Sequence, residues 1–491
     1  MAKHFFFSLS LCLVLLFNVS FASEQVKQEN ECPQLQQQHQ CRLDRIEALE
    51  PDTRIQSEAG TIESWNPSRD QFQCAGVAIV RRVIQPNGLL LPAYSNAHQL
   101  AFIVQGRGIT GEMFPGCPET FQEYQGAGGS SRVEDQHQKV RHFRPGDIIA
   151  LPAGVAHWCY NDGNEPVVAI YLLDTANSDN QLDMNPRHFY LAGNPEDEFR
   201  QLYEGRREPG SGRHEGFSSR RRPEGRGTCN NLFCGLDSRL ISEAFNIDES
   251  LARKLQSEND YRGSIINVEG KLQVVRPART QSEREQQVGG SGAGGPYLGG
   301  GGCNGLEETF CSMRLKENIA DPSRADVYIP EVGRVSTINS HNLPILRFLQ
   351  LSASHVVLRN NAVRLPHWHL NAHSIIYALR GQGRVQITDE FGEIVFDGSV
   401  GAGQVLTVPQ NFVVVKQAET ERFEYITFKT SDNAMTNDLV GRTSAVRALP
   451  LEVIANAFRV SREDARRIKF GREETTLGTS RSRPAGRTAV A

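Results

Sequence analysis

Short apolar runs rich in Val, Ile, Phe and Tyr recur along both halves of the chain, with Gly, Pro and Asn between them. This pattern predicts β-strands separated by turns. Pro86, Asn87 and Gly88 separate the first two runs, and we expect a hairpin there in which Gly88 supplies the positive φ angle. The expected strands are 77–84, 89–92, 100–104, 147–151 and 167–173 in the first half, and 345–351, 355–358, 374–379, 384–388, 405–408, 412–416 and 425–428 in the second.

Each set of strands is followed by a segment whose apolar residues recur with the helical period, at 240–255 and at 453–468. Asp248 and Ser461 are suited to cap the second helix of each segment, because their side chains accept hydrogen bonds from free backbone N–H groups. Many short strands with turns between them imply barrels or jelly rolls. The expected fold is therefore mainly β, with two tandem jelly-roll β-barrels, each followed by a helical arm.

The two halves repeat the same residues in the same order. Asn96-Ala97-His98 returns as Asn371-Ala372-His373 at an offset of 275 residues, and each is followed by a Gly-x-Gly turn. The helical segments match at a shorter offset of 213 residues, from Ile241 to Ile454. Two sets of matches in the same order indicate one duplicated unit with insertions between the matched parts.

The length of 491 residues fits two domains of roughly 150–200 residues each, plus loops. Residues 1–22 have the features of a secretory signal peptide, since Lys3 and His4 precede an apolar stretch and a cut is expected after Ala22 or Ser23. No later apolar run approaches the about 20 residues of a membrane-spanning helix. We therefore expect a protein of the secretory pathway with no membrane partner.

The ten cysteines agree with an oxidising compartment. Removal of Cys12 with the signal peptide leaves nine, so at least one is unpaired within the chain. No Cys-x-x-Cys spacing occurs, which argues against a structural zinc ribbon and against a thioredoxin-like site.

Charge differs between the two parts of the chain. From Gly305 onward the sequence has 23 Lys and Arg against 20 Asp and Glu, whereas the remainder has 30 against 37. Only nine of the 53 basic residues are Lys, and the nitrogen-rich Arg suits a nitrogen reserve, although lineage bias explains the same composition equally well. The polar segments at about 122–138, 206–227 and 279–302 are expected to be disordered loops. The Arg cluster at 220–222 is assigned to solvent and not to nucleic acid.

Two motifs contain His residues at spacings that are typical of metal ligands. Gly146-x5-Pro152-x-Gly154-x2-His157-x3-Asn161 matches the second signature of the cupin superfamily at every position. His367 and His369 follow Leu365-Pro366 as in the first signature, where two His separated by one residue point into the barrel from one strand. The resemblance implies cupin barrels. In metal-binding cupins these two His, a following Glu and the later His bind the ion.

Neither half has this complete ligand set. The first half keeps His157 but has Ala93 and Ser95 at the His pair, and Gln99 or Leu100 at the Glu position. A catalytic metal needs several ligands that converge in one cavity and leave an open position. We therefore expect no metal and no cofactor in the first barrel.

The second half keeps His367 and His369, but Ser374 stands at the Glu position and Val414 at the later His. We therefore interpret His157, His367 and His369 as degenerate cupin metal positions, with no catalytic residues and no cofactor. His373 could join His367 and His369 as a third ligand, so adventitious metal binding there stays open.

His157 is interpreted as a residual barrel histidine that is hydrogen-bonded near Trp158 and Tyr160. Cys159 lies two residues away and alternates with apolar residues on an expected core strand. A buried, inert thiol is therefore favoured over a nucleophile.

Asn304-Gly305-Leu306-Glu307-Glu308-Thr309-Phe310-Cys311 follows a Gly-rich segment. It resembles the processing junction of the legumin-type 11S seed storage globulins, where an Asn-specific vacuolar protease cuts before Gly. Asn87-Gly88 is the same dipeptide held in a turn and should not be cut. Other motifs similar to this family are Ile46–Pro51, Cys74–Ala78, Tyr94–Asn96, Pro115–Phe121, Leu191–Pro195 and Met313–Asn318.

The resemblance covers nearly the whole mature chain and implies two chains after cleavage. The acidic chain would be 23–304, with its barrel core at about 41–278. The basic chain would be 305–491, with its core at about 311–475 and a flexible C-terminal tail, whose last four residues resemble a vacuolar sorting signal.

The resemblance also implies two disulfides. Cys41–Cys74 would lie within the acidic chain, and Cys117–Cys311 would join the acidic chain to the basic chain. The pairing of the remaining cysteines stays open; these are Cys32, Cys159, Cys229, Cys234 and Cys303, among which a local Cys229–Cys234 pair is conceivable.

As a family property, we expect a trimer before processing and a hexamer after it. We further expect delivery to the protein storage vacuole of seed, the Asn-specific processing protease as a partner, and no nucleic acid. Many members of the family are food allergens. The expected function is a nutrient reservoir without enzyme activity, in which neighbouring protomers cover the apolar faces of the arms.

The alternative is a metal-dependent cupin oxidase or dioxygenase. Such an enzyme would hold stoichiometric Mn, Fe or Cu and would lose it when His367 and His369 are replaced by Ala. A carbohydrate-binding jelly roll ranks last, because the sequence predicts no aromatic-rich exposed groove.

Overall fold

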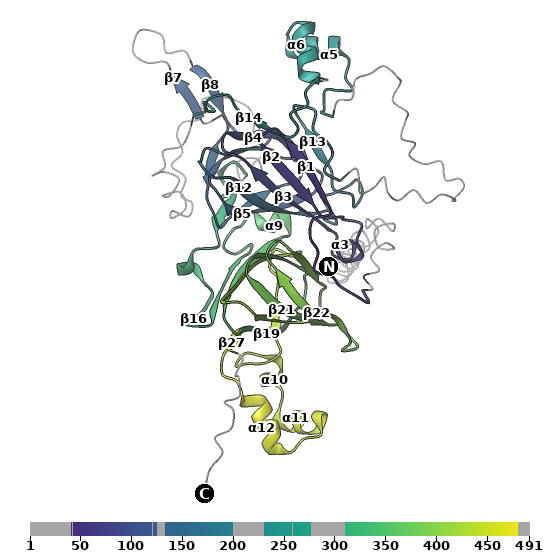
Figure 1. Ribbon diagram of the computed structural model, residues 1–491, viewed down its shortest axis with the longest axis vertical. Helices are drawn as coiled ribbons and strands as arrows, with labels where there is room; N and C mark the ends of the chain where they lie inside the picture. The colour runs from purple at the N-terminus through teal and green to yellow at the C-terminus, as the bar shows by residue number, and fades with distance from the viewer. Residues whose placement is uncertain are drawn as a thin grey trace, which may run out of the picture. The chain divides into compact units, whose positions relative to one another are not determined.

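The computed structural model describes residues 41, 43–119, 121–124, 133–199, 230–257, 259–275 and 310–479 (Figure 1). The described residues from 44 onward form one compact unit. It contains both barrels and both helical arms, as the sequence analysis predicted.

The first barrel consists of two antiparallel sheets. One has the spatial order β1 (Thr53–Ser57), β2 (Gly60–Ser64), β3 (Val77–Ile84), β12 (Val167–Asp174), β5 (His98–Gln105), β10 (Asp147–Leu151) and β15 (Lys316–Asn318). The other has the order β13 (His188–Tyr190), β4 (Gly88–Ser95), β11 (Ala156–Tyr160), β6 (Gly108–Met113) and β9 (Val140–Phe143), and β14 (Ile265–Asn267) also pairs with β4. A short helix, α3 (Asp70–Ala75), precedes β3, and the arm that follows contains α5 (Ser238–Phe245) and α6 (Glu249–Gln256).

The second barrel repeats this arrangement. One sheet has the order β16 (Val327–Ile329), β17 (Gly333–Ile338), β18 (Ser352–Arg359), β25 (Arg422–Lys429), β20 (Ser374–Arg380) and β23 (Val405–Val408). The other has the order β22 (Ile394–Gly401), β21 (Gln382–Thr388), β24 (Val413–Ala418), β19 (Ala362–His369) and β26 (Thr436–Asp438), and β27 (Leu477–Thr479) also pairs with β19. Helix η1 (Pro322–Arg324) precedes β16, and α9 (Leu346–Leu349) lies between β17 and β18. The arm contains α10 (Ala445–Ala448), α11 (Leu451–Phe458) and α12 (Arg462–Phe470).

The strand β25 shows why so many residues of these barrels are apolar on both faces. Tyr425 points into the barrel, where the Lys416 ammonium of the opposite sheet lies 5.5 Å from its ring. Ile426 and Phe428 point the other way and belong to an apolar cluster shared with the first barrel. Both faces are therefore buried, which removes the simple apolar–polar alternation of a half-exposed strand.

The shared cluster joins the two barrels through one continuous core. Trp65 of the first barrel contacts Tyr377 of the second edge to face, with ring centroids 6.1 Å apart, and its Nε1 donates to the Leu49 carbonyl. The cluster also contains fully or nearly fully buried side chains from both barrels, among them Phe72, Phe102, Ile148, Leu172, Ile338, Leu346, Val405 and Phe428.

Each barrel also holds a segment from the other side of the Asn304–Gly305 junction. Strand β15, which follows the junction in sequence, pairs with β10 of the first barrel, and Lys316 forms a buried ion pair with Asp147 there. In the opposite direction, Leu49 exchanges two backbone hydrogen bonds of 2.8 Å with Val405 of the second barrel. Backbone hydrogen bonds and apolar packing therefore connect the two sides of the junction independently of the peptide bond.

Three local expectations were wrong. Residues 345–351 were expected to form a strand but contain the helix α9, whose Leu346 and Leu349 face the shared core. A short apolar run does not distinguish a buried strand from a buried helix, and here the i, i+3 spacing suits the core.

The turn at Asn87-Gly88 is not a hairpin, because β3 and β4 belong to different sheets. The positive φ of 61° belongs to Asn87, which together with Asp tolerates this conformation better than most residues. Gly88 is required for space, since a Cβ there would lie 2.8 Å from the Gln85 carbonyl oxygen.

The segment 122–138 was expected to be a disordered loop, but β7 (Phe121–Tyr124) and β8 (Val133–His137) pair within it. The other expected loops, 206–227 and 279–302, lie outside the described residues. Asp248 and Ser461 cap α6 and α12 as predicted. Within the ranges that the structure describes, no helix has the length and apolar character needed to cross a bilayer.

Candidate functional site

The His residues interpreted as degenerate metal positions lie on different strands of the two barrels. His157 of β11 lies opposite Ala93 of β4, and His367 of β19 lies opposite Val414 of β24. Strands β4 and β19 correspond, as do β11 and β24. Each barrel therefore keeps a His on the strand where the other barrel has an aliphatic residue.

His157 lies in a small internal cavity of the first barrel, lined mainly by apolar side chains such as Ile103, Phe143 and Leu151. Its ring stacks on Tyr171 at 6.4 Å between centroids. Neither ring nitrogen has a hydrogen-bond partner among the described residues, so the expected hydrogen bond near Trp158 and Tyr160 was wrong. Those two side chains lie an odd number of residues away and so point to the opposite face of the strand.

A charged cluster beside His157 was not identified from the sequence. The buried Arg82 donates to Glu198 at 3.0 Å, and its guanidinium carbon lies 4.4 Å from the centre of the Tyr171 ring. The Tyr190 hydroxyl and the His188 ring also contact Glu198. The only signal in the sequence was that Arg82 stands among apolar residues on the inward-facing side of strand β3.

Burial, followed by the positive charge of Arg82 and by His188, lowers the pKa of His157 to about 3. His157 is therefore neutral over most of the acid range. Burial raises the pKa of the Cys159 thiol, which is free and buried as expected. A His with so low a pKa is a weak general base, and a thiol that stays protonated is not a thiolate nucleophile at mildly acidic or neutral pH.

In the second barrel, His367 and His369 both point inward from β19, with ring centroids 5.7 Å apart. His367 Nδ1 lies 2.7 Å from the Leu365 carbonyl oxygen, which makes Nδ1 the donor and leaves Nε2 as an acceptor. The Lys416 ammonium occupies that position, 3.4 Å from Nε2. The Lys416 side chain thus occupies the ring nitrogen of His367 that a metal ion would need.

His373 does not join this pair. Its Nδ1 accepts a hydrogen bond from the Gln410 backbone at 3.3 Å, in the turn outside the His pair. Among the described residues, no three His, Cys, Asp or Glu side chains are placed to hold one metal ion. The donor set therefore does not fit the resident metal of an oxidase or a dioxygenase.

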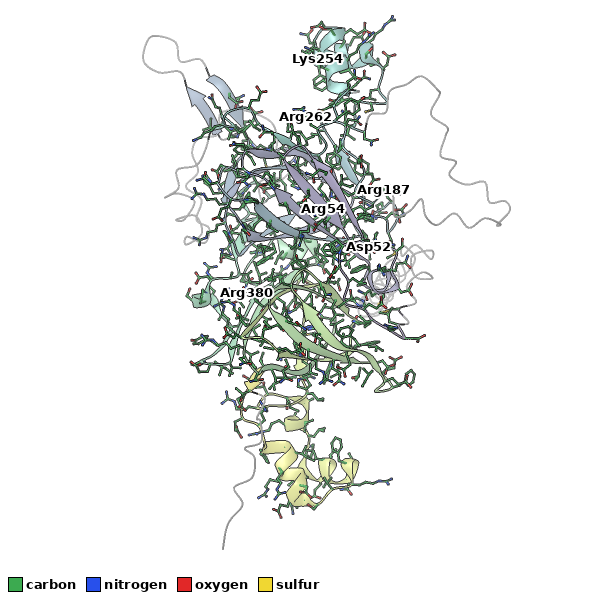
Figure 2. All side chains as sticks on the ribbon, in the orientation of Figure 1. Asp52, Arg54, Arg187, Lys254, Arg262 and Arg380 are labelled. Carbon is green, nitrogen blue, oxygen red and sulfur yellow. A yellow bond between two sulfur atoms is a disulfide. The ribbon has the colours of Figure 1, made fainter. Side chains whose placement is uncertain are left out.

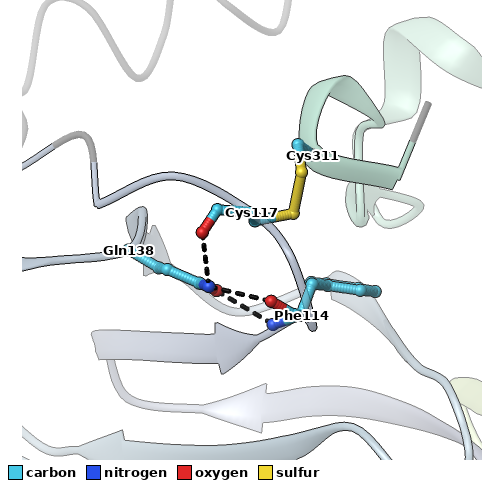
Figure 3. Close-up of a disulfide and its surroundings, with 4 residues drawn as sticks. All are labelled: Phe114, Cys117, Gln138 and Cys311. Carbon is cyan, nitrogen blue, oxygen red and sulfur yellow. Dashed lines mark hydrogen bonds between the residues drawn. A yellow bond between two sulfur atoms is a disulfide. The ribbon is translucent and has the colours of Figure 1, made fainter. Parts of the chain in front are cut away.

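The disulfide Cys117–Cys311 joins the two sides of the junction (Figure 3). The Gln138 side chain fixes the loop that carries Cys117: it accepts from the Phe114 backbone N–H at 2.9 Å and donates to the Phe114 and Cys117 carbonyls at 2.8 and 2.9 Å. The loop is thus held in place on one side of the bond.

The other cysteines are placed less completely. Cys41, Cys74 and Cys234 are each in a disulfide, and the pairing Cys41–Cys74 stays a prediction. The positions Cys32, Cys229, Cys303, Asn304 and Gly305 lie outside the described residues.

Comparison with known proteins gives consistent results. A family model described as cupin matches residues 46–197 and 317–466. An 11S globulin seed storage protein of Carya illinoinensis is 56% identical over 98% of this chain and 98% of its own length. An 11S globulin of Juglans nigra is 55% identical over 98% of this chain and 97% of its own length. The crystal structure of the coconut allergen cocosin, 45% identical, superposes with a TM-score of 0.75 over 90% of this chain and 100% of that one.

The buried His157 predicts a specific pH dependence of stability. With a folded pKa of about 3 and an ordinary value of 6.5, the unfolded chain takes up the proton first as the pH falls. Stability is thus lost between pH 6.5 and 3, and this His alone accounts for about 3 kcal/mol between pH 7 and pH 4. We expect His157→Gln to reduce the loss of unfolding free energy over this range, measured by urea denaturation at both pH values.

The exposed His341→Gln is the matched control and should behave as the wild type does. Equal losses in the wild type and in His157→Gln would contradict the assignment of His157 as a neutral buried group.

Proposed function

This chain belongs to the 11S seed globulins, a family of two-barrel cupin proteins, and we propose that it is a seed storage protein that supplies nitrogen and amino acids at germination. The observation that carries the proposal is similarity along the full length of relatives that are named seed storage proteins. The barrel interiors support it, because apolar side chains surround His157 and the Lys416 side chain contacts His367, at places where a cupin enzyme holds its metal.

The metal-dependent oxidase or dioxygenase is the weaker alternative. It requires several ligands in one barrel, whereas His157 and the pair His367 and His369 lie in different barrels. Lys416 and Arg364 add positive charge beside the pair. We therefore propose that the protein is not an enzyme.

We propose that an Asn-specific processing protease cuts the chain between Asn304 and Gly305 into an acidic and a basic chain. The paired strands β10 and β15, the Leu49–Val405 hydrogen bonds and the Cys117–Cys311 disulfide support this proposal, because they keep the products together after the cut. We further propose that both chains are deposited in the protein storage vacuole of the seed.

The helical arms are the proposed surfaces of self-association, first into trimers and, after processing, into hexamers. Each arm exposes large apolar side chains that its own barrel does not cover. They are Leu240, Phe245 and Leu251 in the first arm, and Val453, Phe458, Ile468 and Phe470 in the second. Burial of such side chains by a neighbouring protomer removes apolar surface from water, at about 25 cal/mol for each Å².

Processing at the proposed position gives a defined new N-terminus. Incubation of the unprocessed protein with an Asn-specific endopeptidase should yield a basic chain that begins with Gly305, and Asn304→Gln should remain uncut at this position. Edman sequencing of the basic chain checks this.

Asn87-Gly88 serves as the control within the same sample. Its backbone is held by hydrogen bonds to Asn161, Gln85 and Val268, so no fragment should begin at Gly88. A basic chain that begins elsewhere than at Gly305 contradicts the processing proposal.

The role of the arms predicts that a charge at their apolar surface weakens assembly. Phe458 is 54% exposed in the second arm. Phe458→Asp should shift the unprocessed protein from trimer towards monomer, by roughly 30-fold or more in the dissociation constant if this side chain is an interface hot spot. Sedimentation velocity over a concentration series measures the shift.

Phe391→Asp provides the matched control, since Phe391 is 81% exposed but lies on the turn between β21 and β22, outside the arms. Unchanged assembly of Phe458→Asp, or equal weakening by both substitutions, argues against the arms as the interface.

A further inference from the structure

The interior of the second barrel contains two buried lysines without a carboxylate partner. Lys416 on β24 is 3% exposed and Lys429 on β25 is 6% exposed. Among the described residues, most cations are exposed or partly exposed, as are Lys254, Arg262 and Arg380, which are labelled in Figure 2. A buried ammonium normally has an acidic partner.

Lys316 shows how this chain accommodates a buried lysine elsewhere. It is almost as buried as the other two, and its ammonium lies 3.2 Å from the carboxylate of Asp147. In the part of the chain that the structure describes, no carboxylate lies within ion-pair distance of Lys416 or Lys429.

The contacts of the two ammonium groups are neutral. Lys416 donates to His367 Nε2 at 3.4 Å and lies 5.5 Å from the centre of the Tyr425 ring. Lys429 donates to the Ser354 hydroxyl at 2.8 Å. An ammonium has three N–H donors, so donors remain on both groups after these contacts.

Two acids lie nearby, and neither neutralises the pair of lysines. Asp438 accepts from the buried Arg364 at 2.7 Å and balances that charge. Asp326 acts on Lys429 only through space and raises its pKa less than burial lowers it. The three cations thus exceed the two acids, and only Arg364 has a direct ionic partner.

The three buried cations lie on three strands of this barrel, Arg364 on β19, Lys416 on β24 and Lys429 on β25. Burial and then Lys429, Lys416 and Arg364, in this order, lower the pKa of His369 to about 2. Burial, Arg364 and Lys429 likewise lower the pKa of Lys416 well below its ordinary value.

Two buried hydroxyl groups of this barrel lack hydrogen-bond partners among the described residues. Ser374 is directly opposite Lys429 in the ladder of β20 and β25, and the Tyr425 hydroxyl lies on the ring that Lys416 contacts. Unused ammonium donors and unpartnered hydroxyls are together the donor set that binds an oxyanion.

The first barrel resolves the same problem differently. Its buried Arg82 is paired with Glu198, which the chain itself supplies. We propose that the interior of the second barrel binds a small oxyanion, a carboxylate or phosphate, held by Lys416, Lys429 and the neighbouring hydroxyls of Ser374 and Tyr425. This site goes beyond the storage role and does not depend on it.

The bound anion would supply the counter-charge that the second barrel lacks. It would accept hydrogen bonds from both ammonium groups and keep them protonated inside the barrel. Phosphate and carboxylate share this chemistry, and the experiment therefore tests both.

The test is equilibrium dialysis of the full-length protein with labelled phosphate and, separately, labelled acetate, at constant ionic strength in chloride. Purified protein is also denatured and the released anions are identified by ion chromatography, which detects an anion trapped during folding. The wild type should bind or release one oxyanion for each chain.

Lys416→Met and Lys429→Met should weaken this binding by roughly 10- to 100-fold, the range expected for loss of a charge-assisted hydrogen bond. The exposed Lys271→Met is the matched control and should retain wild-type binding. Ser374→Ala keeps both ammonium groups and should weaken binding less, so it still tests the site if a lysine variant fails to fold. Circular dichroism identifies the folded variants.

Tighter binding of phosphate identifies a phosphate site, and tighter binding of acetate identifies a carboxylate site. Either result supports the proposal if the lysine variants lose the binding. The proposal is overturned if no saturable binding is seen up to about 10 mM anion and denaturation releases no anion. This result excludes even a site with a Kd near about 1 mM. Binding that persists unchanged in the folded variants indicates an adventitious ion only and also overturns it.

Discussion

The apolar core shared by the two barrels is the interaction on which the rest of this structure depends. Side chains such as Trp65 and Tyr377 come from opposite barrels and are buried against each other. Large buried aromatic groups contribute several kcal/mol each, far more than one surface contact. The sheets that face this core carry large apolar side chains there, and separation of the barrels would expose these side chains to water.

Segments exchanged between the barrels strengthen the connection that this core makes. Strand β15 lies in the sheet of the first barrel, and Leu49 is hydrogen-bonded to the second. Because these segments come from opposite sides of the junction, a cut there removes one peptide bond and leaves the packing of the core intact. This arrangement is suited to a protein that is processed after it has folded.

In both barrel interiors, other side chains lie at positions where metal-binding cupins hold their ion. In the first, apolar side chains surround His157, and the nearby charges of Arg82 and Glu198 cancel. In the second, the Lys416 ammonium lies against His367 Nε2. The proposed anion would complete the charge balance in the second barrel, as Glu198 does in the first.

Much of the fold followed from the sequence because repeated motifs and short apolar runs are local signals. The strands at Val77–Ile84 and Asp147–Leu151 were predicted to the residue. The helix α9 was not, because a short apolar run suits a buried helix as well as a buried strand. The Arg82–Glu198 pair was missed as well, because its partners are 116 residues apart and only the fold brings them together. The burial of Lys416 and Lys429 was missed too, because the sequence does not show which side of a strand faces the barrel interior.

The most direct measurement of the central claim is native mass spectrometry of protein cut in vitro between Asn304 and Gly305, after reduction of its disulfides under non-denaturing conditions. If the shared core and the exchanged strands hold the two barrels together, each protomer should still contain one acidic and one basic chain after Cys117–Cys311 is reduced. Separation into free acidic and free basic chains would show that the disulfide holds them together, and would contradict this account.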